Sequence, residues 1–251
     1  MRIYSRLRAQ FRFRFRPVPF VVMLLLVALG LALAQWQQRR ADEKIARAAR
    51  LEAGNLAAPL SLGAAPLLPQ DAQAIEYRRV TLTGRFVPAW TVYLDNRPYR
   101  GQAGLHVLTP FQIEGSNMHV LVAQGWLPRN NTDRTRIADY RTPTGTVTLQ
   151  GVARLHAGHV MQLGTAAPLA PHAIVQNADI AQLANASGLA FQPLLVEQTS
   201  PESASLPVRD WPAPDLGADK HRGYAFQWYA LALMAILFFV FTGFRRANKS
   251  P

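Results

Sequence analysis

Two uninterrupted hydrophobic segments lie near the two ends of the chain. Neither residues 17–34 nor residues 224–244 contain a charged side chain. At a rise of about 1.5 Å per residue, helices of these lengths match the roughly 30 Å hydrocarbon core of a bilayer. The pattern predicts two transmembrane helices, at residues 17–36 and 221–244. The first is expected to continue as a helix into the mixed-charge residues up to Glu52, with Gly54–Asn55 as its stop.

Between these segments the pattern changes to short β-branched runs, each of which ends at turn residues. Strands are predicted at residues 77–83, 91–94, 105–109, 146–155 and 194–197, and a short helix at residues 179–186. Pro110 is expected to end its strand. Residues 111–113 and 118–123 flank Glu114–Asn117, whose turn chemistry predicts a β-hairpin.

The predicted fold is therefore a membrane protein, with two transmembrane α-helices (N- and C-terminal) flanking a β-rich α+β extramembrane domain. The expected segments, in order, are a basic cytoplasmic arm (1–16), transmembrane helix 1 (17–36), a helical extension and Pro-rich connector (37–70), a β-rich periplasmic domain (71–197), a Pro-rich tether (198–220), transmembrane helix 2 (221–244) and a basic cytoplasmic tail (245–251).

The net charge of +12 lies almost entirely outside the β-rich region. Residues 51–222 carry thirteen Lys/Arg and thirteen Asp/Glu, which argues against a nucleic-acid-binding surface on that domain. Six arginines precede the first span and three basic residues follow the second. Because positive residues stay on the cytoplasmic side, both termini are predicted to be cytoplasmic, with the arm on anionic membrane lipid. Three lysines against twenty-four arginines favour a bacterial origin, hence the inner (plasma) membrane.

The first hydrophobic segment also allows a second interpretation. Ala32-x-Ala34 after a basic start is typical of a signal peptide, which would be cleaved before Gln35. In that case the chain would be a secreted or lipid-facing β-domain protein with a single membrane anchor at its C-terminus.

The chain lacks the residues of most catalytic and metal sites. Absence of cysteine excludes disulfides, iron–sulfur clusters and thiolate ligation. No nucleophile elbow, phosphate loop or paired-histidine metal motif is present, so the chain is predicted not to be an enzyme. His156 and His159 are expected in a solvated turn, His106 and His119 as packed or surface residues of strands. Ion pairs with Asp95 are expected for the turn residues Arg97 and Arg100.

His221 is the one histidine that adjoins a membrane span. On a helix extended back by one turn, His221, Tyr224 and Trp228 fall on one face at i, i+3 and i+7. Such rings are common at the headgroup level of membrane proteins. Alternatively, His221 is an iron ligand of a haem whose flat ring lies along this face. If the two spans pack together, residues 36–39 and 221–222 become neighbours.

Four stretches, in order and at suitable spacing, resemble the Surfeit locus protein one family, also called the Shy-one type. They are Gly30 to Arg39; Tyr77 to Phe86 followed by Asn96-Arg97-Pro98; Gly104 to Pro110 with Val120 to Pro128; and His221 with Tyr224 to Ala232. Two departures stand out. The family usually has an arginine where this chain has Gln124, and often a phenylalanine at Tyr229.

The resemblance implies an assembly factor for haem-copper (cytochrome c) oxidase that binds haem a and aids its insertion into the catalytic subunit. His221 matches the family position for iron ligation, and Tyr224, Gln227 and Trp228 are carried over as pocket or packing residues. Expected partners are the oxidase catalytic subunit, haem-synthesis proteins and membrane lipid, with no nucleic acid. The alternative is a cofactor-free membrane scaffold that stabilises an oxidase subunit during assembly.

Overall fold

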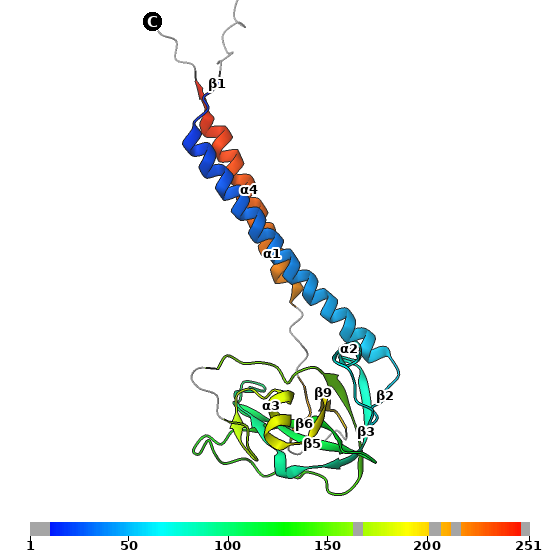
Figure 1. The fold of residues 1–251 in the computed structure, drawn as a ribbon. Coiled ribbons are helices and arrows are strands. Elements are labelled where there is room, and N and C mark those ends of the chain that lie inside the picture. Colours follow the sequence, from blue (N-terminus) through cyan, green and yellow to red (C-terminus); the bar gives the residue numbers. More distant parts are fainter. Residues whose placement is uncertain (1–10, 163–167, 201–206, 212–216, 247–251) are drawn as a thin grey trace, which may run out of the picture. The chain divides into compact units, whose positions relative to one another are not determined.

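The computed structural model describes residues 11–162, 168–200, 207–211 and 217–246 (Figure 1). The predicted arm before residue 11, the tail after residue 246 and two stretches of the tether lie outside these residues. The chain forms two units, which are described separately. One comprises residues 1–49 and 215–251, and the other comprises residues 50–214.

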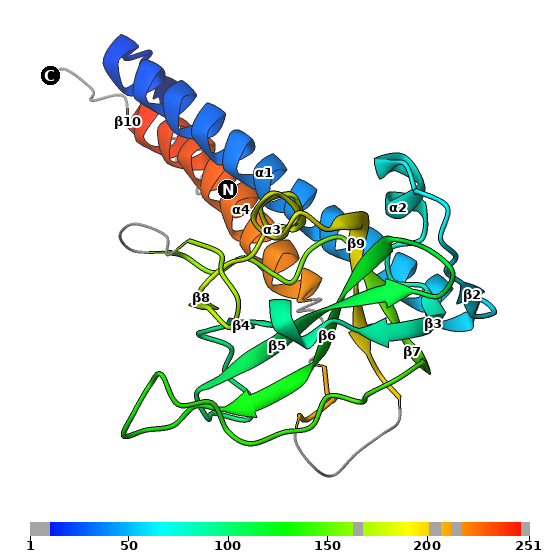
Figure 2. The same ribbon diagram turned by 60° about the horizontal axis from the view of Figure 1, so that its bottom comes forward.

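The first unit is a pair of antiparallel helices, α1 (Pro17–Leu56) and α4 (Ala218–Gly243), which run side by side in both ribbon views (Figures 1 and 2). Both are long and apolar enough to cross a membrane. The two predicted spans are thus confirmed as helices. The first helix continues past its expected stop at Gly54, and residues 37–53 contain neither glycine nor proline to interrupt it.

Two short strands join the ends of these helices. Strand β1 (Phe11–Phe13) pairs antiparallel with β10 (Phe244–Arg246), and the backbone N–H of Arg14 donates to the carbonyl of Gly243 at 2.9 Å. The alternation of phenylalanine and arginine, which does not suit an amphipathic helix, here forms a strand. The end of the predicted basic arm is therefore a structured part of the helix unit.

The second unit is built around a closed β-barrel. Its elements are β2 (Leu60–Ser61), α2 (Pro69–Ala74), β3 (Arg79–Phe86), a 3₁₀ turn (Pro88–Trp90), β4 (Val92–Leu94), β5 (Gly104–Ile113), β6 (Met118–Pro128), β7 (Val147–Arg154), β8 (Ile174–Val175), α3 (Ile180–Ser187) and β9 (Ala190–Gln198). The strands follow the order β3-β7-β9-β6-β5, and β5 pairs again with β3. The ring therefore closes with five strands, and β4 and β8 extend it beyond β5.

Alternation along β6 produces two hydrophobic cores. Val120 and Val122 pack in one cluster with residues of β3, β7 and β9, such as Leu82. Leu121 and Ala123 belong to a second cluster that includes Leu183 of α3. The short helix is α3 as predicted, and Asp179 caps it, its carboxylate accepting from the backbone N–H of Ala181 at 2.8 Å. The predicted β-rich domain and its hairpin are confirmed.

The prediction that Pro110 ends a strand was wrong. Strand β5 pairs with β4 through residues 106–108 and with β3 through residues 111–113. Pro110 lies between these two pairings, where the strand changes its partner and a missing N–H is tolerated. Pro193 similarly lies where the pairing of β9 with β6 shifts register, so β9 begins at Ala190 instead of Leu194.

Part of the tether that was predicted to be irregular is held against the barrel. Val208 and Trp126 exchange two backbone hydrogen bonds, each 2.8 Å long. The indole N–H of Trp211 donates to the carbonyl of Gln198 at 2.8 Å. Tether residues 207–211 thus belong to the β unit, whereas residues 218–220 form the first turn of α4.

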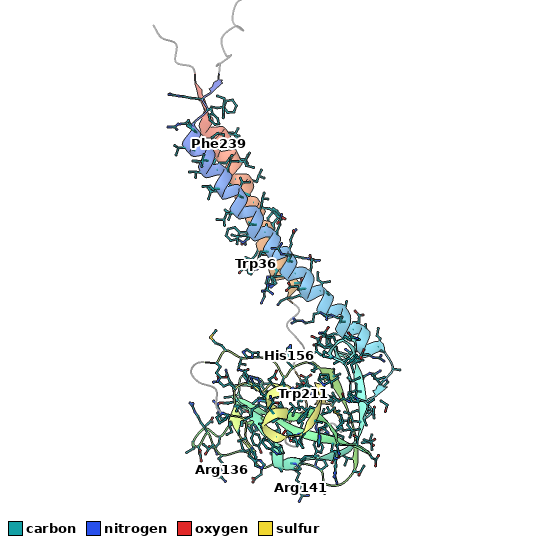
Figure 3. All side chains as sticks on the ribbon, in the orientation of Figure 1. Trp36, Arg136, Arg141, His156, Trp211 and Phe239 are labelled. Atoms are coloured by element: carbon teal, nitrogen blue, oxygen red, sulfur yellow. The ribbon has the colours of Figure 1, made fainter. Side chains whose placement is uncertain are left out.

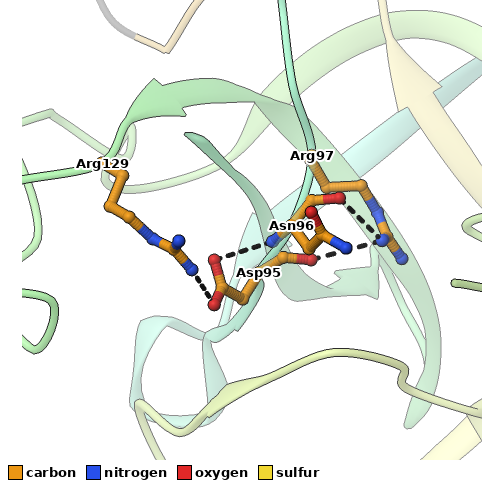
Figure 4. A network of polar contacts seen from close by, with 4 residues as sticks. All are labelled: Asp95, Asn96, Arg97 and Arg129. Carbon is orange, nitrogen blue, oxygen red and sulfur yellow. Dashed lines mark hydrogen bonds and ion pairs between the residues drawn. The ribbon is translucent and has the colours of Figure 1, made fainter. Parts of the chain in front are cut away.

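The expected pairing of Asp95 with Arg97 and Arg100 was also wrong (Figure 4). Asp95 pairs with Arg129, which follows the end of β6. Arg97 is only 7% exposed, and its guanidinium donates to four carbonyl oxygens, those of Asp95, Asn96, Gly158 and Gln176. Arg100 instead pairs with Asp210 of the tether at 3.1 Å. Burial of the Arg97 side chain explains the difference, because a buried cation needs hydrogen-bond acceptors, and the nearby carbonyl oxygens supply them.

Replacing Arg97 with alanine is expected to lower the unfolding free energy by about 3 kcal/mol, because four part-buried hydrogen bonds to carbonyl oxygens lose their charged donor. Arg100→Ala removes an exposed ion pair and should cost less than about 1 kcal/mol. Denaturant unfolding of the full-length chain in detergent, followed by tryptophan fluorescence, measures both. Equal losses would contradict the structural role of Arg97.

Titration of His106 is expected to make the stability of the β unit depend on pH. Burial, with the nearby Arg97 charge, lowers its pKa from 6.5 to about 4. The unfolded chain takes up a proton on this ring below about pH 6.5, whereas the folded domain does so only near pH 4. This contribution to stability is complete above pH 6.5 and falls by up to about 3 kcal/mol as the pH drops towards 4.

The denaturation midpoint, measured between pH 7 and 4, tests this expectation. His106→Phe should flatten the pH slope, whereas His156→Phe, at an exposed position, should leave it unchanged. Glu197, whose pKa burial raises, contributes with the opposite sign, so the comparison of variants is the readout. A slope that His106→Phe does not alter would contradict the assignment.

Candidate functional site

The two membrane helices meet along a seam of small side chains. On α1 the buried residues Gly30, Ala34, Gln37 and Ala41 recur at i, i+4, i+7 and i+11, which places them on one face. On α4 the buried positions that define the facing side are Ala225 and Ala232. Small side chains let two helix backbones approach closely, which is how helices associate in a lipid environment.

Gly30 lies where the two helix backbones come close together. A Cβ atom at this position would lie 3.0 Å from the Cβ of Ala232 and 3.2 Å from the carbonyl oxygen of Trp228. A side chain here would therefore force α4 to shift by a few tenths of an ångström. The register of the two helices is consequently fixed at Gly30, one turn from Ala34.

That register brings His221 of α4 to Gln37 of α1. The Nδ1 atom of His221 lies 2.7 Å from the Oε1 atom of Gln37. An amide oxygen only accepts hydrogen bonds, so Nδ1 carries the proton and donates it. In the neutral ring, Nε2 then presents its lone pair. Among the residues described here, Nε2 has no hydrogen-bond partner.

A second polar contact lies beside the first. The hydroxyl of Tyr229 donates to Oε1 of Gln38 at 3.1 Å. Two consecutive glutamines of α1 are thus each bonded to a different residue of α4. The expectation that residues 36–39 and 221–222 become neighbours when the spans pack is confirmed for Gln37 and His221.

The predicted site residues do not all share this face. His221, Ala225 and Trp228 follow one another at i, i+4 and i+7, and Trp228 is half-buried. Tyr224 is 53% exposed and Gln227 is exposed, so neither belongs to the buried seam. The sequence analysis did not single out Gln37 as the partner of His221. The pattern that could have identified Gln37 is its position seven residues after Gly30, on the helix face formed by small residues.

Three of the other described histidines have partners outside the helix pair. His106 packs edge-on against Trp211, with ring centres 5.0 Å apart, and Nδ1 of His119 lies 3.1 Å from the carbonyl of Ala190. His156 accepts from the N–H of Gly158 within a turn, as predicted. Within the described ranges, no three His, Asp or Glu side chains gather into a group that could hold a metal ion.

Comparison with known proteins decides the family. A family model described as the SURF1 family matches residues 24–233, a range that includes the barrel and parts of both membrane helices. The chain belongs to the SURF1 family. It is 30% identical to the mouse protein named Surfeit locus protein 1, over 48% of this chain and 42% of the mouse protein.

Two further relatives extend this comparison. A SURF1-like protein of Monosiga brevicollis is 26% identical over 86% of this chain and 84% of its own length. The Saccharomyces cerevisiae protein named Cytochrome oxidase assembly protein SHY1 is 30% identical over 37% of this chain and 23% of its own length. The match to the mouse and yeast members thus spans less than half of each.

The structure shows what surrounds Gln124 and Tyr229, the two positions at which the chain departs from the family pattern. Gln124 is fully buried, and its amide donates to the hydroxyls of Thr109 at 2.6 Å and Thr142 at 3.3 Å. A neutral amide therefore fits a neutral hydroxyl network. Tyr229 makes its bond to Gln38 through a hydroxyl that phenylalanine lacks.

The helix register can be tested by crosslinking, because the chain contains no cysteine. Gly30→Cys combined with Ala232→Cys should form an intramolecular disulfide on oxidation of the full-length chain in its membrane, since the two Cβ atoms come within reach. Protection from a maleimide reagent, read as a gel shift, measures the yield. Gly30→Cys with Leu233→Cys is the control, because Leu233 is 56% exposed and faces away. Equal yields for the two pairs would contradict the register.

Proposed function

We propose that this SURF1 family chain assists the assembly of haem-copper cytochrome oxidases, and that it holds haem a through Nε2 of His221 on its way to the catalytic subunit. The observation that carries this proposal is the hydrogen bond from His221 Nδ1 to Gln37 Oε1. The assembly role is supported by similarity to relatives such as the yeast protein named Cytochrome oxidase assembly protein SHY1.

The hydrogen bond prepares the ring for iron. Histidines that bind metals almost always donate their second ring N–H to a carboxylate, a carbonyl or water, which fixes the tautomer and raises the basicity of the ligating nitrogen. Gln37 supplies such an oxygen. Because Gln37 is only 9% exposed, water competes weakly for this bond.

The donor set suits a haem better than a bare metal ion. A bare ion needs several protein ligands, whereas the porphyrin supplies four nitrogens to its iron and requires only axial ligands from the protein. His221 offers one, partly exposed at the edge of the seam. Trp228 on the same face and the exposed ring of Tyr224 nearby provide apolar surface for the macrocycle, with Gln227 beside them. Haem a would supply the iron centre, and this chain would orient and release it.

The location follows from the two helices and their flanking charges. The chain is proposed to lie in a bacterial inner membrane with both termini in the cytoplasm and the barrel in the periplasm. The barrel would contact the oxidase catalytic subunit, and haem-synthesis proteins would deliver the haem. A reporter enzyme fused after Pro251 should be active in the cytoplasm, and one inserted in the barrel loop at Asn130 should be active in the periplasm. The reverse pattern would contradict this arrangement.

A second candidate function is a membrane scaffold without a cofactor. One observation favours it: the His221–Gln37 bond also ties the two helices together, which gives His221 a structural role that needs no haem. A scaffold would retain the oxidase subunit as its partner.

The two functions differ in the effect of His221→Ala. In a host that makes haem a, the detergent-purified chain is expected to carry a haem absorbance band that His221→Ala removes. Gln37→Leu should keep the iron ligand but weaken haem binding about 10- to 100-fold, as loss of an oriented partner does at metal sites. Titration of the purified chain with haem measures both.

Tyr229→Phe is the matched control, because it removes the other bond between the helices and leaves His221 and Gln37 in place. Haem binding that survives in His221→Ala would contradict the ligand assignment. A colourless wild-type chain that still crosslinks to the oxidase subunit would favour the scaffold.

A further inference from the structure

The end of the helix pair opposite His221 carries a cationic pocket next to an apolar groove. The pocket has a volume of about 380 Å³, and its lining includes Arg14, Arg16, Val18, Pro19 and Thr242. The groove, of about 340 Å³, lies between α1 and α4, and its lining includes Leu26, Leu231, Ala235 and Phe238. Pro19 and Thr242 line both, so the two spaces adjoin.

The two arginines are held in place by their neighbours. The backbone N–H of Arg14 bonds to Gly243, and Phe13 and Phe15 on either side pack against Phe239 with ring centres 5.9 and 6.4 Å apart. Figure 3 shows Phe239 near the end of the helix pair where β1 begins. The arm therefore presents its guanidinium groups from a fixed backbone.

The positive charge of the pocket is uncompensated. Within the described part of the chain, neither Arg14 nor Arg16 forms an ion pair with a carboxylate. Arginine binds phosphate oxygens in a bidentate manner, and basic residues at a membrane surface attract anionic lipid. The first turn of α1, whose partial dipole charge is positive, begins at Pro17 in the same pocket.

The groove continues this site into the hydrocarbon region. From Pro19 to Leu26 it covers about 10 Å along α1, roughly two thirds of the hydrocarbon thickness of one leaflet. A ligand that fills both spaces must join an anionic head to a long apolar chain. We infer that the pocket and the groove together bind one anionic phospholipid, with its phosphate at Arg14 and Arg16 and an acyl chain between α1 and α4.

Native mass spectrometry of the full-length chain in detergent tests this site. Dioleoyl phosphatidylglycerol and dioleoyl phosphatidylcholine are titrated separately, and the affinity for the first bound lipid is compared. The wild type should bind one phosphatidylglycerol more tightly than phosphatidylcholine. Arg14→Gln with Arg16→Gln should weaken phosphatidylglycerol binding about 30-fold, which corresponds to about 1 kcal/mol for each guanidinium.

Arg39→Gln with Arg47→Gln is the charge-matched control, because both residues are exposed on α1 away from the pocket. It should bind phosphatidylglycerol as the wild type does. Ala235→Phe fills the groove without altering charge and should weaken binding about tenfold, since the acyl chain loses buried methylene groups. Circular dichroism checks that each variant retains its helices.

Four results would overturn the inference. Equal losses of phosphatidylglycerol affinity in the two double-arginine variants would indicate general charge attraction. Equal wild-type affinity for the two lipids would show that the anionic headgroup is not recognised. Displacement of the lipid by an equal concentration of glycerol 3-phosphate would show that the pocket binds a headgroup without the chain. Retained affinity of Ala235→Phe for phosphatidylglycerol would show that the groove does not hold the acyl chain.

Discussion

The close contact of Gly30 with Ala232 is the constraint on which the arrangement of the membrane helices depends. In lipid, apolar side chains gain little from burial against one another, so helix pairs rely on close packing and on polar contacts. The absence of a side chain at Gly30 permits that packing, and Ala34, Ala41 and Ala225 continue it. Once the backbones lie this close, the position of every polar group on the seam is determined.

The two ends of the helix pair consequently carry different chemistry. At one end the seam becomes polar, and Gln37 orients the ring of His221. At the other end the strands β1 and β10 join, and Arg14 and Arg16 lie beside an apolar groove. The first end suits a planar metal-containing ring, and the second suits an anionic lipid. Neither use requires the other, because they are separated by most of the length of α4.

In the barrel unit, hydrogen bonds hold long loops against a small closed sheet. Arg97 does so by donating to carbonyls of three separate segments, the turn at residues 95–96, the loop at Gly158 and the end of β8 at Gln176. The described tether residues 207–211 add to this through Trp126 and Gln198.

The sequence predicted much of this architecture, because hydrophobic length and β-alternation are local signals. The uncharged segments 17–34 and 224–244 predicted the helices. The turn at residues 114–117 predicted the hairpin between β5 and β6. Closure of the barrel was not predictable, because it depends on β5 changing its partner near Pro110.

For the site, the sequence indicated His221 and placed residues 36–39 near it, but it did not single out Gln37, since the contact joins residues 184 positions apart. Tyr224 and Gln227 lie outside the buried seam, because a helical face is broad and only the partner helix decides which part of it is buried. Arg97 was assigned to Asp95 by proximity in sequence, whereas the ion pair goes to Arg129.

The most direct test of the central claim uses a full-length variant in which His221 is the only histidine, the other five being replaced by glutamine. The chain is produced with ¹⁵N-labelled histidine and loaded with haem, and electron paramagnetic resonance records the nitrogen coupling to the iron. The account predicts that the labelled imidazole coupling of the parent chain persists in this variant. Its loss, with haem still bound, would show that another residue ligates the iron and would contradict the account.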